Sequence, residues 1–216
     1  MTNIENAKRL QLCPAALVGK GWHRECYVHP DNPLRCVKVV VSGSGNENHR
    51  EQRYYHELMK RGVSWEMLPR FYGLIDTNLG EAAVFDLIRD YSGEVSLPLQ
   101  HYLSTEANTT GHVDVLAQAL TALRNYLLDQ RIVTMTLKPK NILFQRSSPD
   151  TGKLVLVDNI GNSDFVPLAR YSTLFARQKI RRKWRRLEAL IGTDFRHNTA
   201  VESLLNTVAT ASGTTR

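Results

Sequence analysis

The first ninety residues carry short apolar runs that predict β-strands. Each run is rich in β-branched or aromatic residues and is bounded by Gly, Pro, Asn or Asp. The runs are residues 17–28, which a glycine-rich turn divides, 35–41, 70–75 and 82–87. A loop at residues 42–46 precedes a helix that the apolar spacing predicts over residues 51–60. We therefore expect a small antiparallel sheet with one inserted helix.

The pattern becomes helical after residues 90–93, where we place a boundary between two lobes. Residues 98–103 form a short candidate helix, and a stripe of apolar residues from Val115 to Leu127 predicts a longer amphipathic helix. Residues 141–145 and 153–157 then predict two short strands.

The rest of the chain, from Asn162, is predicted to be mostly helical, and we expect the polar tail at residues 208–216 to be disordered. These elements predict an α+β fold of two lobes. Residues 1–90 form an N-lobe, with an antiparallel sheet and one helix. Residues 91–207 form a shortened, mainly helical C-lobe.

The composition is that of a globular protein, with 42% hydrophobic and 23% charged residues among 216. No apolar run is long enough to span a bilayer, and the N-terminus lacks the apolar core of a secretory signal, so we expect a cytoplasmic protein. The three cysteines are an odd set without Cys-x-x-Cys spacing, and the histidines are scattered, so neither predicts a disulfide scaffold or a zinc site.

The net charge of +7 comes from one local segment. Seven basic residues and no acid lie between Arg177 and Arg186. Ile180, Trp184, Leu187 and Ile191 share one face of the same predicted helix. One interpretation is a closing helix of the second lobe, with its apolar face in the core. The other is a helix that binds anionic lipid or nucleic acid through residues 177–186.

Polar residues with possible chemistry gather in the stretch from Thr134 to Phe144, which follows the amphipathic helix. It contains Lys138 and Asn141, and the next apolar run ends at Asp158. An amide oxygen and a carboxylate are hard ligands of the kind that Mg²⁺ prefers. This order therefore predicts that Asn141 and Asp158 share one metal ion.

The order of these features along the chain resembles the protein-kinase-like fold. A glycine turn, a strand lysine, a helix glutamate, a Lys-Pro-x-Asn loop and a strand-end aspartate follow one another. The resemblance implies that Gly19 and Gly21 let backbone amides approach the phosphates of ATP, although Arg24 stands where a third glycine would. It also implies that Lys38 reaches those phosphates and is held by Glu51.

For the second lobe, the resemblance implies that Asn141 and Asp158 bind Mg²⁺. Lys138 would then neutralise charge that develops on a transferred phosphoryl group.

Four motifs are similar to the YrbL family, which is named for a PhoP regulatory network in enteric bacteria. They are Gly-x-x-Arg-x-Cys-Tyr-x-His-Pro, Arg-Cys-Val-Lys-Val-Val, Arg-Ile-Val-Thr-Met-Thr-Leu-Lys-Pro-Lys-Asn-Ile-Leu and Val-Asp-Asn-Ile-Gly. The similarity runs from about Leu17 to the basic segment, and residues 132–143 are its most specific part. The family name implies a regulon and no reaction.

Three features depart from working protein kinases. The position of the catalytic base holds Thr136, and Asn159 follows Asp158 where an apolar residue would pack. Only about sixty residues follow Asp158, without an Ala-Pro-Glu motif. General base catalysis is worth roughly 10² to 10⁴-fold, so a missing base slows phosphoryl transfer without forbidding it. Asp164 is a candidate substitute.

Cys26 and Cys36 align with positions that form the apolar ceiling over adenine in kinase-like folds. The simpler interpretation is that both thiols act as small hydrophobic groups. The alternative is a redox pair that closes over an empty pocket.

Two functions stay open. The first is an atypical phosphotransferase that binds ATP and Mg²⁺ and lacks the usual catalytic Asp. The second is a regulatory pseudokinase whose nucleotide-bound state is read by a protein partner. A basic lipid- or nucleic-acid-binding module is a further alternative.

Overall fold

The computed structural model describes residues 9–42, 46–161 and 173–211. The chain divides into two compact units. The first consists of Met1–Tyr55 with Arg70–Leu87, and the second of His56–Pro69 with Ile88–Arg216. Each unit is described by itself below.

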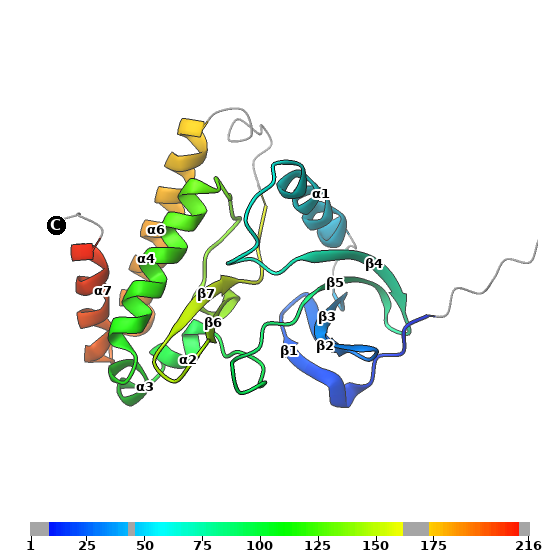
Figure 1. The fold of residues 1–216 in the computed structure, drawn as a ribbon, viewed down its shortest axis with the longest axis horizontal. Helices are drawn as coiled ribbons and strands as arrows, with labels where there is room; N and C mark the ends of the chain where they lie inside the picture. The colour runs from blue at the N-terminus through cyan, green and yellow to red at the C-terminus, as the bar shows by residue number, and fades with distance from the viewer. Residues whose placement is uncertain (1–8, 43–45, 162–172, 212–216) are drawn as a thin grey trace, which may run out of the picture. The chain divides into compact units, whose positions relative to one another are not determined.

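The first unit contains a five-stranded antiparallel sheet in the order β1-β2-β3-β5-β4 (Figure 1). The strands are β1 (Leu17–Lys20), β2 (Arg24–His29), β3 (Asn32–Val40), β4 (Phe71–Thr77) and β5 (Gly80–Asp86). The short helix η1 (Pro14–Ala16) precedes β1, and helix α1 (Asn46–Lys60) follows β3. The predicted antiparallel sheet with one inserted helix is confirmed.

The two faces of this sheet have different contents, because successive side chains of a strand point to opposite faces. Val37 and Val39 lie in a buried apolar cluster with Tyr27 and Ala82. On the other face, Tyr55 of α1 packs against Phe85, with ring centroids 5.2 Å apart. The alternation along β3 therefore sends Cys36 and Lys38 to the face that α1 covers.

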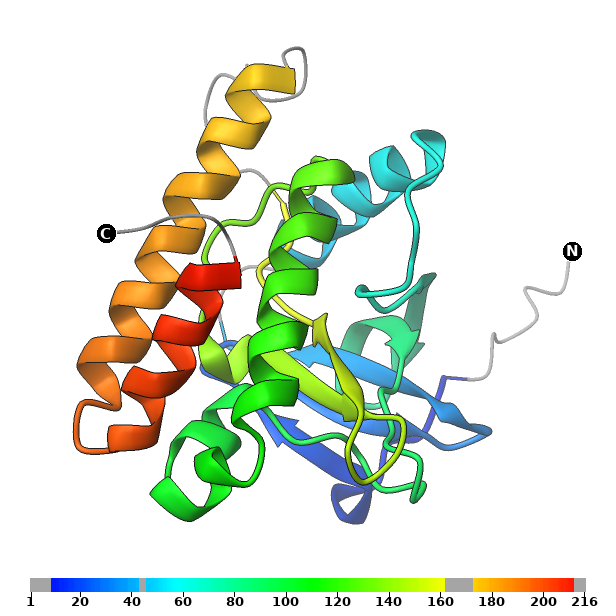
Figure 2. The same cartoon turned by 60° about the vertical axis from the view of Figure 1, so that its left-hand side comes forward.

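The second unit combines a two-stranded hairpin with helices. The hairpin consists of β6 (Ile142–Arg146) and β7 (Gly152–Leu156) and follows the single-turn helix η2 (Pro139–Asn141). The helices of the described residues are α2 (Leu99–Leu103), α3 (Glu106–Thr110), α4 (Val113–Asp129), α6 (Thr173–Asp194) and α7 (Thr199–Ala211). Helix α4 packs against β7, α6 and α7, and Figure 2 shows these three helices side by side.

The apolar stripes predicted for the long helices lie in the core. Leu116, Leu120, Leu123 and Leu127 of α4 are buried. In α6 the four residues Ile180, Trp184, Leu187 and Ile191 are buried as well. Helix α6 is therefore a closing helix of the second unit, as one of the two interpretations predicted.

The basic residues of α6 divide into two groups. Five arginines are exposed: Arg177, Arg181, Arg182, Arg185 and Arg186. Lys179 is buried, and the ammonium of Lys183 donates a hydrogen bond to the Met135 carbonyl. Arginine therefore accounts for the exposed basic face, while the two lysines lie toward the protein.

Some boundaries differ from the predictions. Helix α1 begins at Asn46 and not at Glu51, because residues 46–50 contain no apolar residue that would reveal helical periodicity. Residues 56–69 belong to the second unit, where Met67 and Leu68 are buried and the Met67 carbonyl accepts from the Leu156 N–H. Residues 43–45 of the predicted loop lie outside the described residues.

The expectation of disorder after Thr207 is wrong for residues 208–211. Helix α7 continues to Ala211, and Val208 is buried because it lies on the same face as Val201 and Leu204. Residues 212–216 lie outside the described part of the chain, as do residues 162–172 of the region predicted to be mostly helical. Among the described helices, none combines the length and apolar character needed to cross a membrane.

Asn198 joins the start of α7 to the helices α2 and α3. Its amide nitrogen donates to the Leu103 carbonyl at 3.0 Å and to the Thr109 hydroxyl at 2.7 Å. Its amide oxygen accepts from the Ala200 N–H at 3.2 Å, which caps the helix. The side chain is buried, so these bonds are shielded from water.

We predict that Asn198→Ala lowers the free energy of unfolding by about 2 kcal/mol, because buried partners lose their hydrogen bonds. Chemical denaturation of the purified variant measures this change. Asn206→Ala, at an exposed position of the same helix, is the matched control and should change it by less than about 0.5 kcal/mol. Equal effects of the two substitutions would contradict the assignment.

Candidate functional site

Strand register in the first unit aligns several predicted site residues in one row. Gly19 of β1 lies opposite Cys26 of β2, and Cys26 lies opposite Lys38 of β3. Lys38 in turn lies opposite Ala83 of β5. Residues directly opposite one another share a face of the sheet. The sheet therefore brings Gly19, Cys26 and Lys38 together on one face.

The turn between β1 and β2 requires a small residue at Gly21. The Gly21 N–H donates to the Arg24 carbonyl at 2.8 Å. A β-carbon at Gly21 would lie 3.1 Å from that same oxygen, which is closer than ordinary contact. Gly21 is thus explained by the closure of the turn itself, independently of any phosphate.

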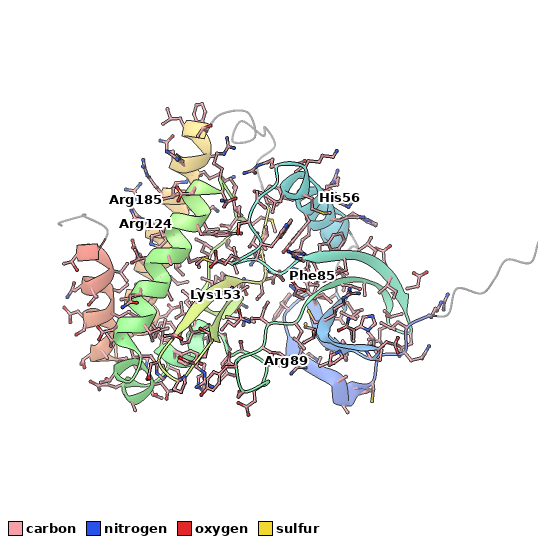
Figure 3. All side chains as sticks on the ribbon, viewed as in Figure 1. His56, Phe85, Arg89, Arg124, Lys153 and Arg185 are labelled. Carbon is pink, nitrogen blue, oxygen red and sulfur yellow. The ribbon has the colours of Figure 1, made fainter. Side chains whose placement is uncertain are left out.

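Lys38 is a buried cation, with 9% of its surface exposed. Its ammonium lies over the ring of Phe85 on β5, 4.6 Å from the centroid (Figure 3 labels Phe85). A cation is attracted to the negative face of an aromatic ring, and burial strengthens this attraction. Phe85 thus stabilises the lysine from one side.

Glu51 is also buried, and the structure shows Arg24 as its ion-pair partner. The Arg24 guanidinium donates to one carboxylate oxygen of Glu51. The other oxygen, Oε1, is buried without a hydrogen-bond partner among the described atoms. Sequence reasoning assigned Glu51 to Lys38 and regarded Arg24 only as a missing glycine. Arg24 of β2 is thus a cation at Glu51 that the sequence did not predict, and the pairing of Glu51 with Lys38 stays a prediction.

The two cysteines lie on neighbouring strands. Cys36 is buried and its thiol donates to the Asp86 carbonyl at 3.5 Å. A hydrogen bond with the Cys26 thiol and burial together raise the pKa of Cys36 well above its usual range. The thiolate that a redox reaction needs is therefore disfavoured at Cys36. This favours the hydrophobic interpretation, and the redox pair stays a hypothesis.

In the second unit, backbone pairing brings the predicted metal ligands close together. The Val157 N–H donates to the Asn141 carbonyl at 3.0 Å, so Asn141 lies beside the residue that precedes Asp158. Asn141 is buried, and its side-chain nitrogen has no hydrogen-bond partner among the described atoms. A turn of 180° about the amide would present the oxygen at the same place.

The loop that carries Thr136 is held against the segment after Asp158. The Met135 N–H donates to the Asn159 carbonyl at 2.8 Å, and the Gly161 N–H donates to the Val133 carbonyl at 3.1 Å. Thr136 itself is exposed. The expected base position is therefore well anchored through the backbone, although its side chain is a hydroxyl. Asp164, the candidate substitute base, lies outside the described residues.

Asn159 has a backbone reason for its place after Asp158. Its φ is 60°, in the left-handed region that asparagine enters more readily than apolar residues do. Its N–H donates to the Asp158 carboxylate at 2.9 Å. The departure from an apolar residue at this position therefore accompanies a tight turn that orients Asp158.

Two further residues of the second unit complete the local picture. Lys138 is exposed at the start of η2, where its carbonyl accepts from the Asn141 N–H at 2.9 Å. Lys183 of α6 donates to the Met135 carbonyl, next to Thr136. Sequence reasoning missed Lys183, because nothing in the spacing of α6 identifies a residue of the earlier loop as its partner.

Comparisons with known proteins agree on one family. The sequence profile of the family described as PhoP regulatory network protein YrbL matches residues 10–191. The chain is 38% identical over 183 residues to a protein described as uncharacterized protein YrbL from Escherichia coli strain K12, covering 83% of this chain and 87% of that protein. It is equally similar to the protein of the same description from Shigella flexneri.

We predict that Arg24→Ala destabilises the first unit by about 3 kcal/mol, because it leaves the Glu51 carboxylate buried without its cation. Thermal and chemical denaturation measure the loss. The double variant Arg24→Ala with Glu51→Gln removes the orphaned charge and should recover part of it. Additive losses in the double variant would show that the ion pair contributes nothing.

We predict that alkylation by iodoacetamide at neutral pH modifies Cys13, which is exposed, and leaves Cys36 unmodified. The raised pKa keeps Cys36 in its unreactive thiol form, and burial keeps iodoacetamide away from it. Mass spectrometry of digested protein locates the label. Cys13→Ser should abolish the rapid alkylation of the protein. Rapid labelling of Cys36 in that variant would refute the argument that Cys36 is protected by burial.

Proposed function

This chain belongs to the YrbL family, and within that family we propose that it binds ATP with Mg²⁺ through a protein-kinase-like constellation of residues. One observation carries the proposal: Lys38 and Glu51 are charged residues with only 9% and 6% of their surface exposed. Burying two charged side chains costs free energy even where each has a partner, and replacing such groups by apolar residues is often neutral or stabilising. A polyphosphate ligand gives a functional reason for keeping a lysine at this position.

Each residue has a defined task in this proposal. Lys38 binds the phosphates, and Gly19 and Gly21 leave room for them beside the backbone of the β1–β2 turn. The second cation, Arg24, occupies one oxygen of Glu51 and leaves the other for Lys38. The apolar surface around Cys26 and Cys36 contacts the base.

The metal part of the proposal rests on Asn141 and Asp158, which supply oxygen ligands that suit Mg²⁺. No group of three or more His, Cys, Asp or Glu side chains in the described ranges could hold a metal ion. The ion would therefore need oxygens from the nucleotide's phosphates to complete its coordination. This agrees with the usual binding of Mg²⁺ through one or two carboxylates and substrate phosphates.

Phosphoryl transfer without an aspartate base is the first form of activity that we propose. Lys138 is exposed and can approach a phosphoryl group, where it would neutralise developing charge. The loose transition state depends more on positioning and charge than on proton removal. We therefore expect slow transfer to a substrate.

The second candidate is a regulatory pseudokinase, and the exposed Thr136 favours it. A hydroxyl at the base position leaves nucleotide binding intact. It does not accept the proton of the substrate, so it does not accelerate phosphoryl transfer. The relatives' family description refers to a PhoP regulatory network, which suits a role in which a protein partner reads the bound state. A third candidate, binding of anionic lipid or nucleic acid by residues 177–186, has the exposed arginines of α6 in its favour.

We predict that Mg·ATP raises the melting temperature of the protein and that Lys38→Met and Asp158→Ala remove this shift. A ligand at about 100 times its dissociation constant stabilises the folded state by about 2.7 kcal/mol. Lys38→Met keeps the apolar stem and so limits damage to the fold. Differential scanning fluorimetry with and without Mg²⁺ measures the effect.

The matched controls are Lys60→Ala and Asp129→Ala, which change exposed residues of the same types. They should keep the full shift. Incubation with labelled ATP then separates the first two candidates. Transfer that Lys38→Met abolishes favours the phosphotransferase, and transfer only in Thr136→Asp favours the pseudokinase. Absence of any shift in the wild type would refute nucleotide binding and favour the third candidate.

A further inference from the structure

A cavity in the second unit has no part in the proposed nucleotide site. Its volume is about 340 Å³, at the lower end of the range for small-molecule sites. It lies between the turn that follows β5 and the β6–β7 hairpin. Its lining residues are Arg89, Asp90, Tyr91, Gln145, Arg146, Ser147 and Lys153. Figure 3 labels Arg89 and Lys153, which lie on these two segments.

The base of this cavity is organised by the buried carboxylate of Asp90. The Asp90 carboxylate accepts three hydrogen bonds. They come from the side-chain Nε–H of Arg146 at 2.8 Å, from the backbone N–H of Arg146 at 3.1 Å and from the Ser96 hydroxyl at 2.5 Å. The Tyr91 N–H donates to the Arg146 carbonyl at 2.9 Å. The guanidinium of Arg146 is thereby fixed along one edge. Such preorganisation reduces the entropy that a ligand must remove on binding.

The other edge of the Arg146 guanidinium is available. Among the described residues, no hydrogen bond is made by its two terminal nitrogens, and its carbon lies 5.7 Å from the ring centroid of Tyr91. The Lys153 ammonium likewise makes no hydrogen bond or ion pair within the described ranges. Gln145 instead is occupied, since its amide donates to the Arg89 carbonyl at 2.9 Å.

The residues that line the cavity include more cationic than anionic side chains. Three cationic side chains line it, and Asp90 is the one carboxylate among the lining residues. Asp90 already has three donors from the protein. The exposed Glu94 belongs to the same turn but does not line the cavity. Asp90 compensates the charge of Arg146, whose terminal N–H groups still face the cavity, and the positive charge of Lys153 remains for a ligand or solvent ions to neutralise.

We propose that this cavity binds a phosphomonoester group. A phosphomonoester carries a charge of about −1.5 to −2 near pH 7, which matches the surplus of cations. The free edge of Arg146 presents two parallel N–H donors, the geometry that phosphate oxygens accept in pairs, and Lys153 adds a mobile point charge. A carboxylate, with a single charge, would neutralise less of the cavity.

The phosphate can belong to a small metabolite or to a phosphorylated protein side chain, since both present the same group. The proposal does not depend on nucleotide binding, because none of its residues belongs to the ATP constellation. It would make the second unit a receptor for a phosphorylated molecule.

Isothermal titration with inorganic phosphate tests the site, first in the wild type and then in Lys153→Ala. We expect saturable binding of one phosphate and a loss of about tenfold in affinity in the variant, the usual effect of one charge-assisted hydrogen bond. Arg146→Lys keeps a cation beside Asp90 and should also weaken binding, because it removes the paired donors. Lys153 is only half-buried and unpaired, so its variant should fold normally.

Two controls make the result specific. Lys60→Ala removes an exposed lysine of the same unit and should bind phosphate like the wild type. Lys38→Met should also bind like the wild type, even if it has lost ATP, so failure of one proposal leaves the other standing. Absence of saturable binding overturns the proposal, as does equal weakening by Lys60→Ala or a loss only in Lys38→Met.

The source of the phosphate is then identified with glycerol phosphate and with a phosphoserine peptide beside its unphosphorylated form. Tighter binding of either phosphorylated probe than of inorganic phosphate, lost in Lys153→Ala, supports the site and names its source. Equal binding of the phosphorylated and unphosphorylated peptides, together with no Lys153-dependent binding of glycerol phosphate, contradicts it.

Discussion

Strand β3 lies between β2 and β5, and its register with both neighbours determines which side chains of the first unit share a face. A slip of one residue would send Lys38 into the apolar cluster of Val37 and Val39 and would bring those valines beneath helix α1. The register is fixed on one face by close apolar packing and on the other by the contacts of Tyr55 and Phe85. The buried position of the lysine is thus a consequence of how the whole sheet pairs.

Most elements of the fold could be predicted because their apolar spacing is local. The spacing of apolar residues predicts the strands from Leu17 to Asp86 through a period of two residues, and helix α4 through a period of about 3.6 residues. Helix α3 was missed because its sequence, Glu-Ala-Asn-Thr-Thr, is short and polar, and its stability comes from Thr105 at the cap and from Asn198. The early start of α1 was hidden for a similar reason, since residues 46–50 carry no apolar side chain.

The candidate site was predictable in its residue types and less so in its pairings. Lys38, Glu51, Asn141 and Asp158 could be selected from their order along the chain. The partnership of Arg24 with Glu51 joins residues 27 positions apart, on strand β2 and helix α1, and no local pattern encodes it. In the sequence, Arg24 only marks the absence of a third glycine from the glycine turn. In the folded unit, it provides the buried Glu51 carboxylate with a cation. The hydrogen bond from Lys183 to Met135 escaped prediction in the same way.

Helix α7 lies beyond residue 191, where the match to the family profile ends, yet it contributes to the core of the second unit. Val201, Leu204 and Val208 are buried, and the helix packs against α4. The surface of α4 beneath it is therefore apolar by necessity. In a relative without an equivalent helix, the same surface of α4 would be an exposed apolar patch. A second chain, of the same protein or another, would have to cover that patch to exclude water from it.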